Sequence, residues 1–205
     1  MSNKYNTSEE IASYGIGKQM GNQLLANPFE NMNFDAVVEG LRDTLNKKES
    51  PITEEQFRVA FTEISAKVEA SKKSAYEEVM AQGQNFLAAN KTKEGVNETA
   101  SGLQYKVVKE GNGEMPKDTS TVVVHYTGTL LDGSVFDSSV QRGQPATFPV
   151  NGVIAGWTEA LQLMKVGSAW KLFIPYNLAY GDQGAGGAIG PYSTLIFDVE
   201  LLEIK

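Results

Sequence analysis

The amino-acid sequence predicts an α+β protein of two domains, an all-α N-terminal half followed by a half rich in antiparallel β-strands. Three observations indicate this division of the 205-residue chain. Fourteen of the 20 glycines lie after residue 100, and no proline occurs between Pro51 and Pro116. The apolar residues also change from helical spacing to short β-branched and aromatic runs. We therefore expect a helical dimerisation domain at 1–95 and a β-rich domain at 96–205.

The first half contains three segments with helical spacing. A first helix begins at Ser8, and a second covers residues 33–47. Thr53 and Gln56 fit a capping box, in which each side chain satisfies a backbone N–H near the start of the helix. A long stalk helix is therefore predicted over about residues 53–93. Three short apolar faces make a thin core, so we expect a second copy of the chain to complete it through these N-terminal helices.

The predicted stalk helix changes character along its length. Its apolar stripe consists of Phe57, Phe61, Ile64 and Val68, after which polar residues dominate. A helix that is polar for much of its length is either an exposed spacer or a coil bound to a partner. We favour the spacer, with the early stripe buried against the first two helices.

The second half reads as an antiparallel, curved β-sheet with one short helix. Residues 122–131 form a β-branched and aromatic strand, and Asp132-Gly133 supplies a tight turn into a return strand, which together predict a hairpin. Because side chains alternate along a strand, Tyr126 and His125 face opposite sides. The helix is expected over 155–164, and strands over 103–108, 147–150, 168–175 and 194–204 complete the sheet.

Composition excludes several classes of protein. The net charge is −7, and neither half has the basic excess that nucleic-acid binding requires. No cysteine is present, which excludes disulfides and thiolate zinc sites. No apolar run reaches the roughly 20 residues that span a membrane, and residues 1–10 are polar without an apolar signal region. We expect a cytoplasmic protein that binds neither nucleic acid nor membranes.

The chemistry-bearing residues of the second half point to a lined pocket. His125 has no cysteine or second histidine to form a catalytic triad with, and it is better explained as a structural residue of its strand. The glycine-rich run at 181–190 lacks the Lys-Ser/Thr of a phosphate loop and is expected to be a flexible flap. The remaining candidates are aromatic residues beside polar or turn residues, and the alternative for these is a plain hydrophobic core: Tyr126, Phe136, Phe148, Trp157, Tyr180 and Phe197.

Four separated motifs give these aromatics a family context. They are VHYTGTLLDGSVFDSS at 124–139, VIAGW at 153–157, LAYG at 178–181 and LIFDVELL at 195–202. In this order and spacing, residues 100–205 resemble the FKBP-type (macrolide-binding immunophilin) peptidyl-prolyl cis-trans isomerases. The helical half resembles, more loosely, the dimerisation region of the bacterial Mip-like branch of this family. The resemblance implies an FKBP-like sheet wrapped on one helix.

The resemblance also implies a proline-binding site. Trp157 would be its floor, the Ile154 N–H and the Tyr180 hydroxyl would bind substrate carbonyls, and Arg142 would support Asp137. Ala146 and Gly190 stand where family members often have an aromatic residue and a proline. The complete implied set has catalytic residues Tyr126, Phe136, Asp137, Ile154, Trp157, Tyr180 and Phe197, and substrate-binding residues Val153, Arg142, Phe148 and Ile189.

The expected activity is isomerisation of Xaa-Pro bonds in folding proteins, without a cofactor or metal. The expected partners are unfolded or partly folded proteins, a second copy of the chain, and macrolide inhibitors. An alternative from another class is a non-catalytic peptide-binding chaperone, or holdase, that keeps the same fold. The complete set of pocket aromatics favours the enzyme.

Overall fold

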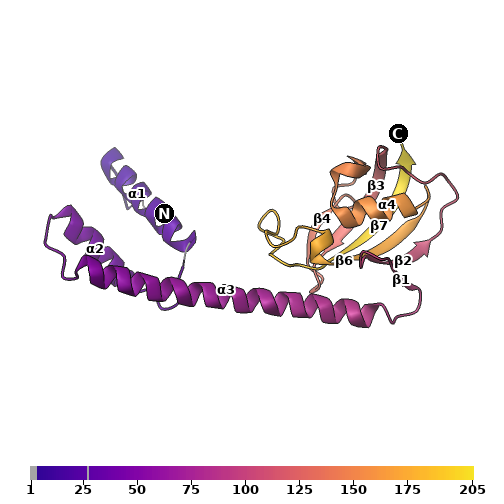
Figure 1. Ribbon diagram of the computed structural model, residues 1–205. Helices are drawn as coiled ribbons and strands as arrows, with labels where there is room; N and C mark the ends of the chain where they lie inside the picture. The colour runs from indigo at the N-terminus through magenta and orange to yellow at the C-terminus, as the bar shows by residue number, and fades with distance from the viewer. Residues whose placement is uncertain (1–3, 27) are drawn as a thin grey trace. The chain divides into compact units, whose positions relative to one another are not determined.

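The computed structural model describes residues 4–26 and 28–205, which form two compact units (Figure 1). The first unit extends to Lys72 and the second begins at Lys73. The division lies within helix α3 (Glu54–Asn90), earlier in the chain than the expected domain boundary at 95/96. The second half of the long helix therefore belongs to the β-rich unit.

The first unit consists of α1 (Ser8–Ala26), α2 (Phe34–Leu45) and the first half of α3. The predicted capping box is confirmed, because the Gln56 N–H donates to Thr53 Oγ1 at 3.2 Å and the Thr53 N–H donates to Gln56 Oε1 at 2.8 Å. The expectation that the first two helices bury the early α3 stripe is wrong for Phe57 and Phe61 in the single chain, whereas Ile64 and Val68 are half-buried. Phe57 and Phe61 remain 59% and 60% exposed, and α1 and α2 have no buried residue among those described.

The second half of α3 is not the exposed spacer that its polarity predicts. Gly83 and Asn90 are buried, and Phe86 packs on Phe173 of the sheet with ring centroids 5.9 Å apart. The prediction was wrong because a narrow face of aromatic and small residues is enough to dock a helix that is otherwise polar. This half of α3 is part of the second unit.

One antiparallel sheet lies at the centre of the second unit, as predicted. Its strands follow the order β1-β2-β6-β7-β3-β4, with β5 paired to β3. The short β1 lies outside the predicted strands, and it is formed by pairing with β2. The strands are β1 (Val96–Glu98), β2 (Gln104–Lys109), β3 (Thr121–Thr129), β4 (Val135–Ser138), β5 (Ala146–Pro149), β6 (Ala169–Ile174) and β7 (Leu195–Ile204).

Helix α4 (Ala155–Leu163) lies across one face of this sheet (Figure 1). It buries Trp157, Ala160 and Leu161 against the apolar side chains of the central strands. This single layer of side chains between helix and sheet is the hydrophobic core of the unit. In the described ranges, no helix is both long and apolar enough to cross a membrane.

Candidate active site

The hairpin of β3 and β4 forms one wall of a cavity through a local irregularity. Gly128 lies opposite Asp137, whereas the next residue, Thr129, lies opposite Val135. Phe136 is therefore the extra residue of a β-bulge, which bends the strand and redirects its side chain. Phe136 and Asp137 can then line the same cavity although they are adjacent in sequence.

The cavity has a volume of about 400 Å³ and lies between the hairpin, the start of α4 and the loop after β6. This volume is within the range of small-ligand sites, which is about 300–1,000 Å³. Nine of the eleven residues expected at the site line it, together with Gly152, which the sequence did not single out. The lining residues are Tyr126, Phe136, Asp137, Phe148, Gly152, Val153, Ile154, Trp157, Tyr180 and Phe197.

Trp157, in the first turn of α4, is held at the base of the cavity by three aromatic rings. Tyr126, Phe148 and Phe197 meet it nearly edge-on, with ring centroids 5.3, 6.0 and 5.2 Å away. Each such pair contributes about 0.5–1.5 kcal/mol beyond the burial of its surface. The indole is 4% exposed, and its Nε1–H has no hydrogen-bond partner among the described residues. The indole ring is therefore a fixed, apolar floor.

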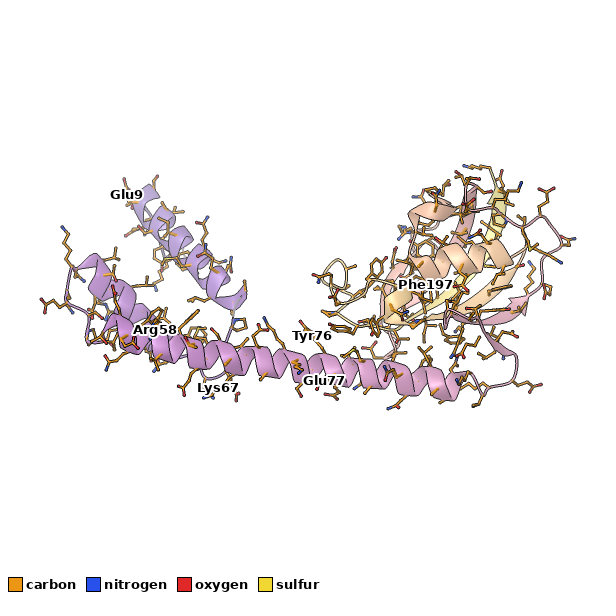
Figure 2. The ribbon with its side chains drawn as sticks, viewed as in Figure 1. Glu9, Arg58, Lys67, Tyr76, Glu77 and Phe197 are labelled. Carbon is orange, nitrogen blue, oxygen red and sulfur yellow. The ribbon has the colours of Figure 1, made fainter. Side chains whose placement is uncertain are left out.

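Gly128 allows two of the cavity rings to approach the β3 backbone. A Cβ at this position would lie 2.5 Å from Phe136 and 2.7 Å from Phe197, closer than any ordinary contact. Phe136 and Phe197 themselves meet edge-on at 5.5 Å, and Figure 2 labels Phe197 within the unit. The absence of a side chain at Gly128 thus sets the position of one side of the cavity.

A hydrogen-bonded trio fixes the polar side of the cavity. The Tyr126 hydroxyl donates to Asp137 Oδ2, and Arg142 Nη1 forms an ion pair with Asp137 Oδ1. Arg142 Nη2 also donates to the Tyr126 hydroxyl oxygen at 3.0 Å. Arg142 does not line the cavity; it holds the two side chains that do.

The trio determines the protonation of its members. Burial alone would raise the pKa of Asp137, but the hydrogen bonds from Tyr126 and Arg142 and the Arg142 charge outweigh it, so that its pKa is lowered. Burial, followed by the hydrogen bond to Asp137, raises the pKa of Tyr126. At neutral pH the site therefore presents a carboxylate and a neutral phenol.

The start of α4 supplies a backbone donor. Ile154 is the N-cap residue, and its carbonyl accepts hydrogen bonds from Trp157 and Thr158 at 2.9 and 3.0 Å. Ile154 lines the cavity, and its own N–H donates to no protein acceptor within the residues described. An N–H in this position can bind a carbonyl oxygen of a ligand.

Two residues are placed differently from the cavity set. Ile189 is buried and joins the core, bridging to Ala185 within the glycine-rich loop, and it does not line the cavity. His125 does not line the cavity; its Nδ1 shares a hydrogen bond with Ser139 Oγ at 3.1 Å, consistent with a structural role. In the part of the chain that the structure describes, no cluster of three or more His, Cys, Asp or Glu residues suits a metal ion.

The chain matches two family models. Residues 112–202 match the FKBP-type peptidyl-prolyl cis-trans isomerase model, and residues 9–107 match the domain amino-terminal to it. The chain is also 50% identical, over 98% of its own length and 97% of the relative's, to the FKBP-type 22 kDa peptidyl-prolyl cis-trans isomerase of Escherichia coli (strain K12). The chain belongs to the FKBP-type peptidyl-prolyl cis-trans isomerase family.

A further relative and a solved structure extend the similarity. The outer membrane protein MIP of Legionella longbeachae is 43% identical over 97% of this chain and 87% of the relative. The crystal structure of FkpA from Escherichia coli is 36% identical, with a TM-score of 0.71 and 98% of both chains covered. The family and the FKBP-like α+β fold predicted from the motifs are thus confirmed, including the helical region that precedes the isomerase.

Proposed function

We infer that the cavity is the site at which this FKBP-type enzyme isomerises Xaa-Pro peptide bonds. The observation that carries this assignment is the aromatic cavity floored by Trp157 and lined by Ile154, whose N–H has no acceptor among the described residues. A proline ring is apolar and fits the aromatic floor. The carbonyl next to it is polar and finds a donor at Ile154.

The rate enhancement follows from the electronic structure of the amide. The planar amide is stabilised by resonance, which imposes a barrier of about 18–20 kcal/mol and makes uncatalysed isomerisation take tens to hundreds of seconds. The twisted transition state is less polar than the planar amide, so transfer from water to an aromatic cavity disfavours the planar form more. An acceleration of about 10⁵-fold requires about 7 kcal/mol of differential stabilisation.

Hydrogen bonds add to this desolvation. A donor that holds a twisted conformer acts only in the transition state and therefore raises the rate rather than the affinity alone. We assign this role to the Ile154 N–H. The Tyr180 hydroxyl is assigned the binding of a substrate carbonyl, which contributes to substrate affinity. The hydrogen-bonded trio of Tyr126, Asp137 and Arg142 keeps the polar side of the cavity fixed. Macrolides are proposed as inhibitors because they would occupy the same apolar cavity.

We further propose that the first unit binds a second copy of the chain. Its large apolar side chains are exposed on all three helices: Ile11, Tyr14, Ile16, Met20 and Leu25 on α1, Phe34, Val38, Leu41 and Leu45 on α2, and Phe57, Val59 and Phe61 on α3. Exposed apolar side chains in such numbers are typical of a protein interface. A homodimer would present two isomerase units to one unfolded client and raise its effective concentration at each site. This dimer would provide the chaperone-like action on folding proteins. The cytoplasmic location of the protein stays a prediction.

A comparison of the full chain with fragment 73–205 tests the enzyme and the dimer together. The fragment begins at Lys73 because the end of α3 packs with the sheet. We expect it to be a monomer with near-normal activity on an Xaa-Pro tetrapeptide, since a short peptide fills one cavity. On a protein whose refolding is limited by proline isomerisation, it should be at least about tenfold less active than the full chain. Sedimentation and the two rate assays give the answer.

A full-length Phe57→Asp/Phe61→Asp variant is the matched control, because it removes apolar surface without removing a helix. We expect it to sediment as a monomer and to behave like the fragment in both assays. Equal refolding activity of the fragment and the full chain would contradict the role of the dimer. An inactive full chain on tetrapeptides would contradict the enzyme and favour the holdase.

A further inference from the structure

The second half of α3 packs against the rest of the isomerase unit through a narrow face. This face is not part of the cavity described above. At the C-terminal end of α3, Asn90 and Gln104 are both 1% exposed, and the Asn90 amide donates to Gln104 Oε1 at 3.0 Å. The Gln104 amide donates in turn to the Leu87 carbonyl at 2.9 Å and to Glu98 at 2.8 Å. Buried polar groups that are all paired fix the relative position of the elements that carry them. The end of α3 is therefore fastened to β1 and β2.

Two turns earlier in the helix, Gly83 permits a closer contact between α3 and the chain segment before β7. Gly83 is buried, and a Cβ at this position would lie 2.4 Å from Thr194 Oγ1. Thr194, which immediately precedes β7, is itself 4% exposed. The α3 backbone therefore lies directly on the chain segment that links the glycine-rich loop to β7.

Tyr76 extends the contact to the loop itself. Its ring lies 5.4 Å from the ring of Tyr192, which lies 5.3 Å from Tyr176 in an edge-to-face arrangement. Tyr192 has a left-handed backbone, with φ of +60°, a conformation that a bulky residue adopts only when its surroundings hold it there. The ring of Tyr76, which Figure 2 labels on α3, is part of those surroundings.

Tyr176 and Tyr192, whose rings are in contact, stand at the two ends of the loop at the cavity. The Tyr192 N–H donates to the Gly181 carbonyl, and the Gly181 N–H donates to the Tyr176 carbonyl, both at 2.9 Å. Tyr180, which lines the cavity, immediately precedes Gly181. A displacement of Tyr192 is therefore passed to the backbone on which Tyr180 stands.

We propose that α3 positions the active site: Tyr76, with Gly83 allowing the close approach, braces the loop 176–192 and so sets the placement of Tyr180. Tyr76 touches no substrate and acts as a positioning residue. The proposal rests on the cavity being the isomerase site. It assigns to the long helix a role in substrate recognition by its own unit, separate from any role in dimer formation.

The test compares three substitutions at neighbouring positions of α3 in the full chain. Tyr76→Ala removes the stack while keeping a strong helix former, Tyr76→Phe keeps the ring, and Glu77→Ala changes the next, exposed residue. We expect Tyr76→Ala to raise KM for an Xaa-Pro tetrapeptide about fivefold with a smaller change in kcat. Tyr76→Phe and Glu77→Ala should match the wild-type protein.

Hydrogen exchange of residues 176–192 gives a second readout that does not depend on activity. We expect about fivefold faster exchange of these amides in Tyr76→Ala, with the amides of β3 unchanged. Gly83→Leu, which forces α3 away from Thr194, should give the same local increase. If Tyr76→Ala matches Glu77→Ala in both KM and loop exchange, the positioning role is overturned. If the loop exchanges faster but KM does not change, α3 braces the loop without setting substrate affinity, which also overturns the proposal. An inactive wild-type chain would instead refute the proposed function.

Discussion

Replacing Asp137 by alanine should lower kcat/KM for an Xaa-Pro tetrapeptide by about tenfold to a hundredfold. The substitution removes the acceptor of the Tyr126 hydroxyl and the partner of Arg142, so that both side chains lose their fixed positions. A hydrogen bond to a charged group contributes about 1.5–3 kcal/mol, and each 1.4 kcal/mol corresponds to tenfold in rate. Stability should change little, because the Asp137–Arg142 pair is more than 40% exposed and exposed ion pairs contribute little.

The same residue determines the response to acid. Because the folded-state pKa of Asp137 is lowered, the carboxylate and the stability it contributes are present above the unfolded pKa of about 3.9. Both are lost as the pH falls through the lower, folded pKa. We expect kcat/KM to be flat between about pH 5 and 8, the range in which a catalytic histidine would titrate. Asp132→Asn, a change of the exposed carboxylate at the hairpin turn, is the matched control. Equal rates for Asp137→Ala and Asp132→Asn would show that the trio does not shape the site.

Replacing Gly128 by valine should have a larger effect, on rate and stability together. The new side chain would occupy the space of Phe136 and Phe197, whose atoms lie within 2.7 Å of the position of its Cβ. Overpacking of this kind costs about 1–3 kcal/mol of unfolding free energy. Misplacement of reacting groups by about 1 Å costs about a hundredfold in rate, so we expect kcat/KM to fall at least that far.

Gly190→Ala provides the control for a glycine substitution in the same unit. A Cβ at Gly190 meets only Ser193 Oγ, at 3.8 Å, and its backbone is open to any residue. We expect the unfolding midpoint in urea to fall clearly for Gly128→Val and to stay within error for Gly190→Ala. A Gly128→Val protein with a normal rate would mean that the two rings do not define the cavity.

Much of the fold could be predicted from local patterns. The capping box at Thr53, the helical spacing of the first half and the Asp132-Gly133 hairpin act over a few residues, and each is found in the structure. The docking of α3 could not be predicted in this way. It depends on contacts of Tyr76 and Phe86 with residues about a hundred positions away in the chain, within a segment whose composition is that of an exposed helix.

The site was predictable in membership more than in geometry. Alternation along β3 placed Tyr126 and His125 on opposite faces, and the motifs named most of the cavity lining. The bulge at Phe136 could not be read from the sequence, because it is defined by the register of two strands. The same holds for Ile189, which turns into the core, and for Gly152, which lines the cavity through its place in the turn before α4.

The central claim is that proline binds on the Trp157 floor and is isomerised there. The chain has two tryptophans, so the indole N–H region of a ¹⁵N spectrum should show two signals, assigned with Trp157→Phe. Trp170 does not line the site and serves as an internal control. Titration with an Xaa-Pro tetrapeptide should shift the Trp157 signal, leave Trp170 in place, and accelerate cis–trans exchange of the peptide in the same samples. Accelerated exchange with an unmoved Trp157 signal, or a shift confined to Trp170, would contradict the account.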